Sequence, residues 1–295
     1  MRYSQLKAFH HVALLGGFSR AAEALFLTQP AISEQVRKLE QEHDVLLFHR
    51  ERKRVRLTEA GEQLFVMTKQ FFEVETRIEE YISEKGAAIE GELRVMVDSA
   101  HHITEILARY RRRYPNVTVS LRTGNTDRIM DDLRAYNCEI GVVGSLPSRQ
   151  DTTVLDLGES EIIAFAAHGV LLGSQTSMSL QDLTKYPLIF REMGSKTRQK
   201  LIEGAAQHGI TLKPAIVAEG REAVREIVAS GAGIGFVSKA EYVHDSRVTQ
   251  FELLDMSITM RESLIHLTQR QDVRVIRSFM DVARAVQAEK TNRRP

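Results

Sequence analysis

The stretch FSRAAEALFLTQPAISEQVRKLE, residues 18–40, contains two short amphipathic segments with a helical period, separated by a turn. The second segment begins at Pro30, and proline suits the first turn of a helix because the amide there has no intrahelical partner. Ile32, Val36 and Leu39 recur on one side of this helix, so that side is predicted to face a core. The opposite side carries small polar residues where a core helix would carry bulky ones.

The polar side is formed by Gln29, Ser33 and Arg37, each four residues after the last. A helix, a tight turn and a second helix with an exposed polar stripe are typical of a helix-turn-helix, whose second helix enters the DNA major groove. Glutamine can bind adenine, arginine can bind guanine or a phosphate, and serine can do either. The stripe therefore predicts a surface that is covered by DNA rather than by protein.

A basic segment follows the two helices. Residues 49–56, HRERKRVR, contain five Lys or Arg residues between two short strand-like runs. A hairpin here would place cations beside flanking phosphates or in the minor groove, as the wing of a winged helix does. A polar surface helix or a basic turn is by itself usually only solvated. Their order and spacing together favour DNA binding over that simpler interpretation.

The composition is that of an ordinary globular protein. Of 295 residues, 43% are hydrophobic and 27% are charged, and the net charge of +1 indicates no particular partner. The single cysteine, Cys138, excludes an intramolecular disulfide and a cysteine-rich metal site. The first residues lack the apolar core of a signal peptide, and no apolar run approaches the roughly 20 residues of a membrane span. We therefore expect a cytoplasmic protein without membrane contact.

The pattern of apolar and polar residues along the sequence predicts three domains. Residues 1–57 are expected to form the winged helix-turn-helix, and residues 58–90 a long helix whose apolar stripe suits dimerisation or packing on its own chain. Strands and helices alternate from residue 91 onward, which is typical of a mainly parallel sheet covered by helices. Two lobes are expected here, one from about 91–160 with 265–295 and the other from about 161–264.

The chain resembles the LysR-type transcription regulators along essentially its whole length. The resemblance rests on LKAFHHVALLGGFSRAAEALFLTQPAISEQVRKLE followed by LLFHRERKRVRLTEAGEQL, which keep the family spacing. It implies an α/β protein with an N-terminal all-α winged helix-turn-helix, a long linker helix and a two-lobed effector domain of the periplasmic-binding-protein type. It also implies a regulator, without cofactor or catalysis, that binds promoter DNA as a homodimer or homotetramer and contacts RNA polymerase; the sequence leaves open whether it activates or represses.

The positions that match the family's DNA contacts are Thr28, Gln29, Pro30, Ser33 and Arg37 in the second helix, with Arg50, Arg52 and Arg54 in the wing. One position departs from the family, in which residue 34 is often basic or small, because it is Glu34 here. An acidic group beside the groove could accept a hydrogen bond from cytosine and shift the base preference. It could also pair with Lys38 one turn later and have no effect, which is the interpretation we favour.

Ligands of α/β lobes bind where strands end and helices begin. Such junctions, which match the family's inducer site, provide the predicted effector-binding residues Ser99, Ala100, His101, His102, Asn125, Thr126, Arg191, Ser195, Thr197 and Glu219. Arg191 and the hydroxyl groups suit a carboxylate or phosphonate, whereas Glu219 or Asp98 suits an amine. The two adjacent histidines point apart on a helix and have no evident third ligand, so no metal site is expected.

The segment MRYSQLKAFHHVA, together with SAHHI and SLRTGN, is also similar to the LysR-type regulators associated with aminoethylphosphonate catabolism. 2-Aminoethylphosphonate carries an anion and an amine. This looser resemblance therefore implies a small anionic metabolite of the phosphonate class as effector.

Two other classes of protein compete with this interpretation. GAGIGF at 231–236 is similar to a dinucleotide-binding loop, but it opens a strand instead of joining a strand to a helix. No nucleophile elbow and no acidic metal cluster is apparent, which disfavours an enzyme. A cytoplasmic solute-binding or sensor protein without direct DNA regulation would need only the C-terminal lobes. The helix-turn-helix and the lack of a signal peptide favour the regulator.

Overall fold

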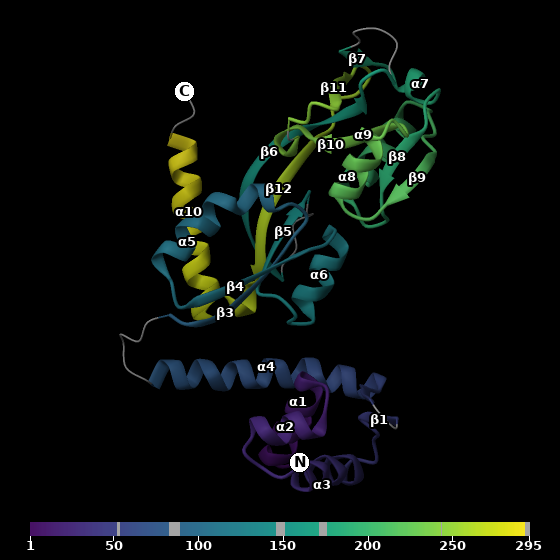
Figure 1. The fold of residues 1–295 in the computed structure, drawn as a ribbon. Helices are drawn as coiled ribbons and strands as arrows, with labels where there is room; N and C mark the ends of the chain where they lie inside the picture. The colour runs from purple at the N-terminus through teal and green to yellow at the C-terminus, as the bar shows by residue number, and fades with distance from the viewer. Residues whose placement is uncertain (52–53, 83–88, 146–150, 171–175, 243, 293–295) are drawn as a thin grey trace. The chain divides into compact units, whose positions relative to one another are not determined.

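A computed structural model of the chain describes residues 1–51, 54–82, 89–145, 151–170, 176–242 and 244–292 (Figure 1). The chain divides into two compact units, Met1–Ala87 and Ala88–Pro295. Each unit has its own hydrophobic core.

The N-terminal unit contains three short helices, a hairpin and a long helix. Its elements are α1 (Tyr3–Leu15), α2 (Phe18–Ala24), α3 (Gln29–Glu42), β1 (Phe48–Glu51), β2 (Arg54–Leu57) and α4 (Glu59–Ile82). The apolar stripe predicted for α3 is buried, because Ile32 and Val36 are 0% exposed and Leu39 is 2% exposed. These side chains pack with Phe9 and Val12 of α1. The helix-turn-helix is therefore held together by the pattern that the sequence shows.

Helix α4 is 24 residues long and is amphipathic. Its first half packs on α1, where the ring of His10 lies 5.5 Å from Phe65 and 4.6 Å from Phe72, measured between centroids. Its second half leaves Val74 and Ile78 about half exposed, at 49% and 54%. Within the N-terminal unit, the apolar row of the second half of α4 thus remains largely uncovered.

The first lobe of the C-terminal unit is built on the strand order β4-β3-β5-β12. Three strands are parallel, β3 (Gly91–Val97), β4 (Val117–Thr123) and β5 (Ile140–Gly144), and β12 (Thr259–Leu267) is antiparallel to β5. Its helices are η1 (Ala100–Ile103), α5 (Thr104–Arg113), α6 (Thr126–Arg134), η3 (Thr268–Arg270) and α10 (Arg274–Asn292). Apolar residues of β3, α5 and α10 form one buried cluster.

The second lobe continues the same sheet in the order β6-β10-β8-β9. Its strands are β6 (Thr152–Ala167), β7 (Ser177–Met178), β8 (Leu188–Arg191), β9 (Pro214–Ala218), β10 (Ile234–Ser238) and β11 (Val248–Leu253). Its helices are α7 (Leu180–Leu183), α8 (Lys196–Gln207), α9 (Arg221–Ala229) and η2 (Lys239–Glu241). As predicted, strands and helices alternate and the neighbours β8, β9 and β10 are parallel.

Two long antiparallel strands connect the lobes. The first half of β6 pairs with β12, and its second half pairs with β10 and β11 (Figure 1). The register between β12 and β6 shifts between Glu262 and Ser263, opposite Gly158 and Asp156, so Leu157 is an extra residue in β6. A bulge of this kind bends a strand and redirects side chains. The mainly parallel sheet predicted from the sequence is thus a mixed sheet at the crossing.

Candidate DNA-binding and effector-binding sites

The predicted recognition stripe, formed by Gln29, Ser33 and Arg37, lies on α3. Thr28 is the N-cap of this helix, and its Oγ1 accepts a weak hydrogen bond of 3.4 Å from the amide of Ala31. Gln29, Pro30 and Arg37 are exposed and Ser33 is half-buried. The helix begins at Gln29, one residue before the predicted start. The five predicted contact residues of this helix thus lie at its N-cap or along its solvent side.

Glu34 forms ion pairs with two basic residues of α3, one more than predicted. The sequence predicts an ion pair with Lys38, and that pair is present at 3.6 Å. Glu34 also accepts two hydrogen bonds of 2.9 Å from Nε and Nη2 of Arg37, and these bonds lower the pKa of its carboxyl group. The guanidinium group proposed to touch DNA is therefore held by an acidic neighbour on the same helix.

The wing is the antiparallel hairpin β1–β2, in which Arg50 pairs with Val55 and Glu51 with Arg54. Arg50 and Arg54 thus lie on its two strands, and Arg52 falls outside the described residues. The carboxylate of buried Glu40, near the end of α3, accepts hydrogen bonds from the amides of Leu47 at 2.9 Å and Phe48 at 3.3 Å. This buried carboxylate fastens the start of the wing to the recognition helix.

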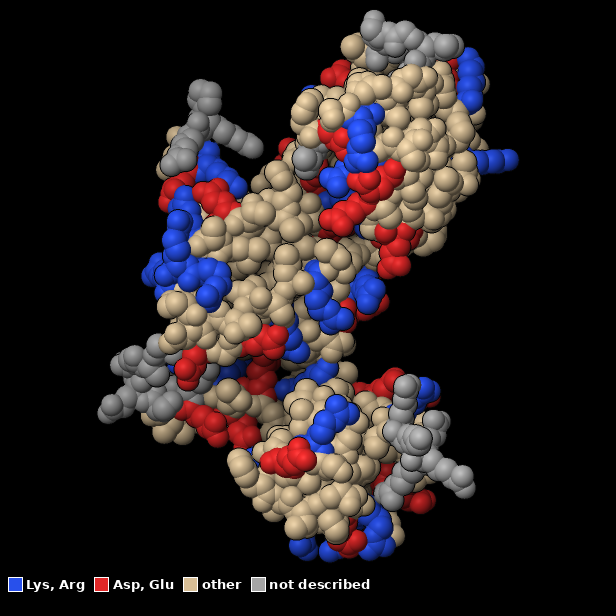
Figure 2. Space-filling view, in the orientation of Figure 1, with Lys and Arg blue, Asp and Glu red and all other residues tan. Residues whose placement is uncertain are grey.

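The C-terminal unit contains a cavity of about 640 Å³ lined by residues of both lobes. The first lobe contributes Asp98, Ser99, His101 and Asn125, among others, and the second contributes Arg191, Glu192, Thr197 and Arg221, among others. Side chains of both charge signs line it. Figure 2 shows the same mixture on the surface of the second lobe, where acidic and basic side chains lie next to each other.

Most of the predicted effector residues line this cavity, namely Ser99, Ala100, His101, Asn125, Arg191, Thr197 and Glu219. Three do not. Thr126 is 1% exposed and its hydroxyl donates a long hydrogen bond of 3.5 Å to the carbonyl of Gly144. Ser195 is 2% exposed and its hydroxyl has no hydrogen-bond partner. His102 turns toward Glu241 instead, as described below.

Asn125 joins the two lobes at the cavity. It caps α6 by accepting from the amide of Arg128 at 3.0 Å, and its Nδ2 donates to the carbonyl oxygen of Met193 at 3.1 Å and to Glu192 at 3.3 Å. Gly194 permits this approach, since a Cβ atom there would lie 2.9 Å from the Asn125 Oδ1. Its φ of +87° also favours glycine.

Arg191 is not a free anion-binding group. It is 6% exposed, and its Nη1 donates to Asp98 at 2.9 Å while its Nε and Nη2 donate to Glu192 at 3.1 and 2.7 Å. Burial raises the pKa of the Glu192 carboxyl, but the hydrogen bonds and charge of Arg191 outweigh burial and bring it to about 2. The sequence predicts that Arg191 is available to bind an anionic ligand. Its guanidinium group is instead already paired with the carboxylates of Asp98 and Glu192.

A second arginine extends the network. Arg221 donates from Nη2 to Asp98 at 3.1 Å and from Nη1 to Glu241 through a short hydrogen bond. The Nε2 of His102 lies 2.7 Å from the same Glu241 carboxylate. Burial raises the pKa of Glu241, yet His102 and Arg221 together hold it below its ordinary value. Ion pairs and hydrogen bonds thus run continuously from Arg191 in β8 to His102 in η1.

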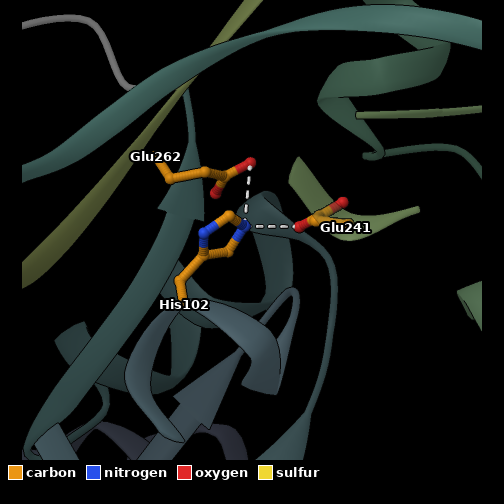
Figure 3. A group of neighbouring side chains, drawn as sticks. All are labelled: His102, Glu241 and Glu262. Carbon is orange, nitrogen blue, oxygen red and sulfur yellow. Dashed lines mark hydrogen bonds and ion pairs between the residues drawn. The ribbon is translucent and has the colours of Figure 1, made fainter. Parts of the chain in front are cut away.

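Glu262 completes this cluster (Figure 3). It is 2% exposed, and neither of its carboxylate oxygens has a hydrogen-bond partner. Its Oε1 lies 3.8 Å from Nε2 of His102. Burial, and next the negative charge of Glu241, raise its pKa to about 7.

Sequence reasoning missed Glu192, Glu241 and Glu262 as site residues. Glu241 lies three residues after β10, at the end of a strand, which is the position where ligand-binding residues are expected in such lobes. Glu262 is the only carboxylate in the strand segment ESLIHL, whose other residues are uncharged or histidine, and a buried strand is an unusual position for a charge. Glu219, predicted to bind an amine, has an 83% exposed side chain that lies 3.9 Å from Arg128.

The comparison with protein families decides the identity of this architecture. The model described as "LysR substrate binding domain" matches residues 86–288, and the model described as "Bacterial regulatory helix-turn-helix protein, lysR family" matches residues 3–62. The chain belongs to the LysR family. This LysR-family protein is a DNA-binding transcription regulator with an effector-binding domain, and not an enzyme.

Known proteins show the same architecture. The transcriptional activator CmpR of Synechocystis is 28% identical over 236 residues, which are 79% of this chain and 78% of CmpR. Full-length OxyR of Pseudomonas aeruginosa superimposes with a TM-score of 0.76 at 19% identity, covering 96% of this chain and 95% of OxyR. CbnR complexed with its target DNA gives a TM-score of 0.67 at 21% identity, covering 97% of this chain and 99% of CbnR. Among the helices described, none could cross a membrane.

Proposed function

We propose that this LysR-family regulator responds to a small metabolite that carries both an anionic group and an amine, with 2-aminoethylphosphonate as the first candidate. The observation that carries the proposal is the cavity of about 640 Å³, which both lobes line with side chains of both charge signs. Ligand pockets of this kind are commonly between about 300 and 1,000 Å³. A small zwitterion fits within that space.

The charge arrangement supports a zwitterion better than a simple anion. Arg191 and Arg221 both reach the cavity, and Asp98 bridges them. A lone anion would compete with Asp98 and leave this buried carboxylate without its partners, which is costly. A ligand with its own ammonium group could occupy both sides of the network, with the anion near Ser99 and the arginines and the amine near the carboxylates.

DNA recognition is assigned to the residues that match the family's contacts. In this proposal Gln29, Ser33 and Arg37 face the major groove, Thr28 and Pro30 set the start of the helix at the backbone, and Arg50, Arg52 and Arg54 of the wing bind flanking phosphates. Residues 1–57 then form the DNA-binding domain, 58–90 the linker and 91–295 the effector domain. Its place of action is the cytoplasm.

The exposed apolar row of α4 supports a role in dimerisation. Val74, Ile78 and Ile82 are 49%, 54% and 75% exposed, and a helix with an uncovered apolar stripe is a natural partner for its own copy. A homodimer or homotetramer would occupy two DNA sites. CmpR is described as an activator, and we extend this role, with contact to RNA polymerase, to the present chain.

The proposed switch acts through the lobes. Ligand between the lobes changes their angle, and the linker helices pass the change to the spacing and bend of the bound DNA. Because binding free energies are linked, the effector and the DNA state must bias each other by the same factor.

Calorimetric titration of the full chain with 2-aminoethylphosphonate tests the ligand, with phosphate, β-alanine and taurine as comparison compounds. We expect saturable binding of 2-aminoethylphosphonate alone, weakened at least about tenfold in Ser99→Ala, since one hydrogen bond to a charged group is worth about 1.5–3 kcal/mol. Ser246→Ala, an exposed serine outside the cavity, is the matched control. Equal affinity for all four compounds, or none for any of them, would refute the zwitterion proposal.

A further inference from the structure

His102, Glu241 and Glu262 come from three different parts of the C-terminal unit. His102 belongs to η1 of the first lobe, Glu241 to η2 of the second lobe, and Glu262 to the crossing strand β12. Their side chains converge on one point (Figure 3), and one ligand atom from each lies within 4.8 Å of the others. This is an assembly of one imidazole and two carboxylates, separated by more than a hundred residues between His102 and the two acids.

The three side chains are buried, and several of their oxygen atoms have no hydrogen-bond partner. The side chains are 9%, 2% and 3% exposed in the order His102, Glu241, Glu262. Both oxygens of Glu262 and the Oε2 of Glu241 lack any hydrogen-bond partner. Since buried carboxylate oxygens are almost always hydrogen-bonded or bound to a cation, three such atoms in one place call for a ligand.

The strand geometry directs Glu262 to this place. The register of β12 against β6 shifts between Glu262 and Ser263, and the residue opposite Glu262 is Gly158, with a φ of +126°. Bulges are common where a strand must redirect a functional side chain. The backbone is thus irregular at the residue whose carboxylate points at His102.

Carboxylates outnumber guanidinium groups around the cluster. The connected network contains four carboxylates and two guanidinium groups, from Asp98, Glu192, Glu241, Glu262, Arg191 and Arg221. With neutral His102 and ionised carboxylates, its formal charge is two negative units. One divalent cation would neutralise the network in this protonation state.

We propose that His102, Glu241 and Glu262 form a binding site for a divalent first-row transition metal ion of the zinc type. The imidazole nitrogen selects such ions over Mg²⁺ and Ca²⁺, which prefer oxygen ligands alone. Two ligand atoms on a tetrahedral zinc ion lie about 3.3 Å apart. The His102 Nε2 lies 2.7 Å from Glu241 and 3.8 Å from Glu262, and all three ligand atoms lie within 4.8 Å of one another, so movements on the order of an ångström bring them to tetrahedral spacing.

An ion here would hold the two lobes together. It would join one ligand from each lobe and one from a crossing strand, beside a wall of the effector cavity, since Glu241 also lines the cavity. Arg221, which donates to Glu241, would act as a positioning residue that orients one ligand. The ion therefore provides a second input to the angle between the lobes, separate from the organic effector.

The test uses the full chain, stripped of metals by a chelator and titrated with Co²⁺, whose visible absorption reports coordination by nitrogen and oxygen. We expect one Co²⁺ per chain, displaced by Zn²⁺ but not by Mg²⁺. His102→Gln and Glu262→Gln should weaken Co²⁺ binding by more than about 100-fold, since even outer-shell changes cost 10–100-fold. His101→Gln is the matched control, because the neighbouring ring lines the cavity and is not among the three ligands.

Three results would overturn the metal site: absence of saturable Co²⁺ absorption in the wild type, equal binding by Glu262→Gln, or loss of binding in His101→Gln. If a variant fails to fold, X-ray absorption of the zinc-loaded wild type decides, since one imidazole among oxygen ligands is required. Calorimetry with 2-aminoethylphosphonate on the same samples separates this proposal from the proposed effector. If Glu262→Gln abolishes that binding while the wild type binds no Co²⁺, the cluster binds the ligand's amine and the metal proposal fails.

Discussion

The recognition stripe on α3 and the network of ion pairs around Arg191 and Asp98 in the cleft between the lobes differ in the exposure and pairing of their polar groups. On α3, Gln29 and Arg37 are exposed, and Arg37 meets its acidic partner Glu34 only three residues away. In the cleft, Arg191 is 6% exposed and its partner Asp98 lies 93 residues away along the chain. The polar groups of the stripe are exposed and accessible to another molecule, whereas the charged side chains of the cleft pair with one another.

This difference determines what a ligand must do at each place. DNA can approach the stripe by displacing water and loosening one exposed ion pair, which costs little. A cleft ligand must enter a network whose members already satisfy one another, so it has to replace the contacts that it breaks. Affinity at the stripe should therefore respond gradually to mutation, while the cleft should respond through stability as well as binding.

The largest effect is expected in the cleft. Arg191→Ala removes the guanidinium from Glu192 and from one oxygen of Asp98, which leaves buried charge without its partner and should cost about 3–5 kcal/mol of unfolding free energy. Denaturant unfolding of the full chain measures it. The control is Arg128→Ala, whose side chain is 57% exposed and 3.9 Å from Glu219, and it should cost less than about 1 kcal/mol. An equal loss of unfolding free energy in the two variants would contradict the difference between buried and exposed ion pairs.

A smaller effect is expected at the stripe. Gln29→Ala should weaken binding to DNA selected from random duplexes by about 5- to 150-fold, corresponding to about 1–3 kcal/mol for one base contact. It should leave stability unchanged because the side chain is exposed. Gln41→Ala, near the other end of the same helix, should bind DNA normally. If both variants bound alike, Gln29 would have no role in base recognition.

The buried histidine of the N-terminal unit extends the comparison to pH. His10 is 8% exposed with its Nδ1 3.0 Å from the Thr68 hydroxyl, and burial, with His11 and Lys69 adding, lowers its pKa to about 4. The unfolded chain therefore binds the proton more readily between pH 6.5 and 4, and stability falls as the pH falls. The expected loss at pH 5.5 is about 1.4 kcal/mol.

Hydrogen exchange of peptides from α1 reports this loss, compared at pH 7.5 and 5.5 after correction for intrinsic rates. His10→Gln should remove the pH dependence and His11→Gln should keep it. A pH response that survives in His10→Gln would assign it to another group.

The smallest effect concerns the pair within the stripe. Glu34→Gln releases Arg37 and removes an acidic charge next to the phosphates, so DNA affinity should rise about two- to fivefold at low salt, consistent with the weak energy of an exposed pair. Fluorescence anisotropy with the selected DNA measures this rise. Glu62→Gln on α4 is the exposed control. Unchanged affinity in Glu34→Gln would show that the pair is irrelevant to binding.

Local sequence patterns predicted much of the fold. The buried face of α3 follows from the spacing of Ile32, Val36 and Leu39, and Pro30 predicts its start to within one residue. The parallel strands around β3 and β8 follow from their alternation with helices. The antiparallel crossing could not be foreseen in the same way, because the pairing of β6 with β12 joins residues about a hundred positions apart and includes a bulge.

The candidate sites divide along the same line. The polar stripe could be read from a single helix, because its neighbours are three and four residues apart. The strand-end rule found Ser99, Asn125 and Arg191, but not that Arg191 is paired with its neighbour Glu192 and with Asp98, 93 residues away. The sequence predicts no metal site at His102, because it shows no third ligand. Glu241 and Glu262 lie beside it only once both lobes have folded.

The most direct measurement of the central proposal is a footprint of the full-length protein on its selected DNA, with and without saturating 2-aminoethylphosphonate, together with the bend angle of that DNA. We predict that the ligand shifts the protected region or changes the bend, and that Ser99→Ala needs more ligand for the same change while Ser246→Ala does not. An unaltered footprint and bend at saturating ligand would contradict a switch operated from the cleft.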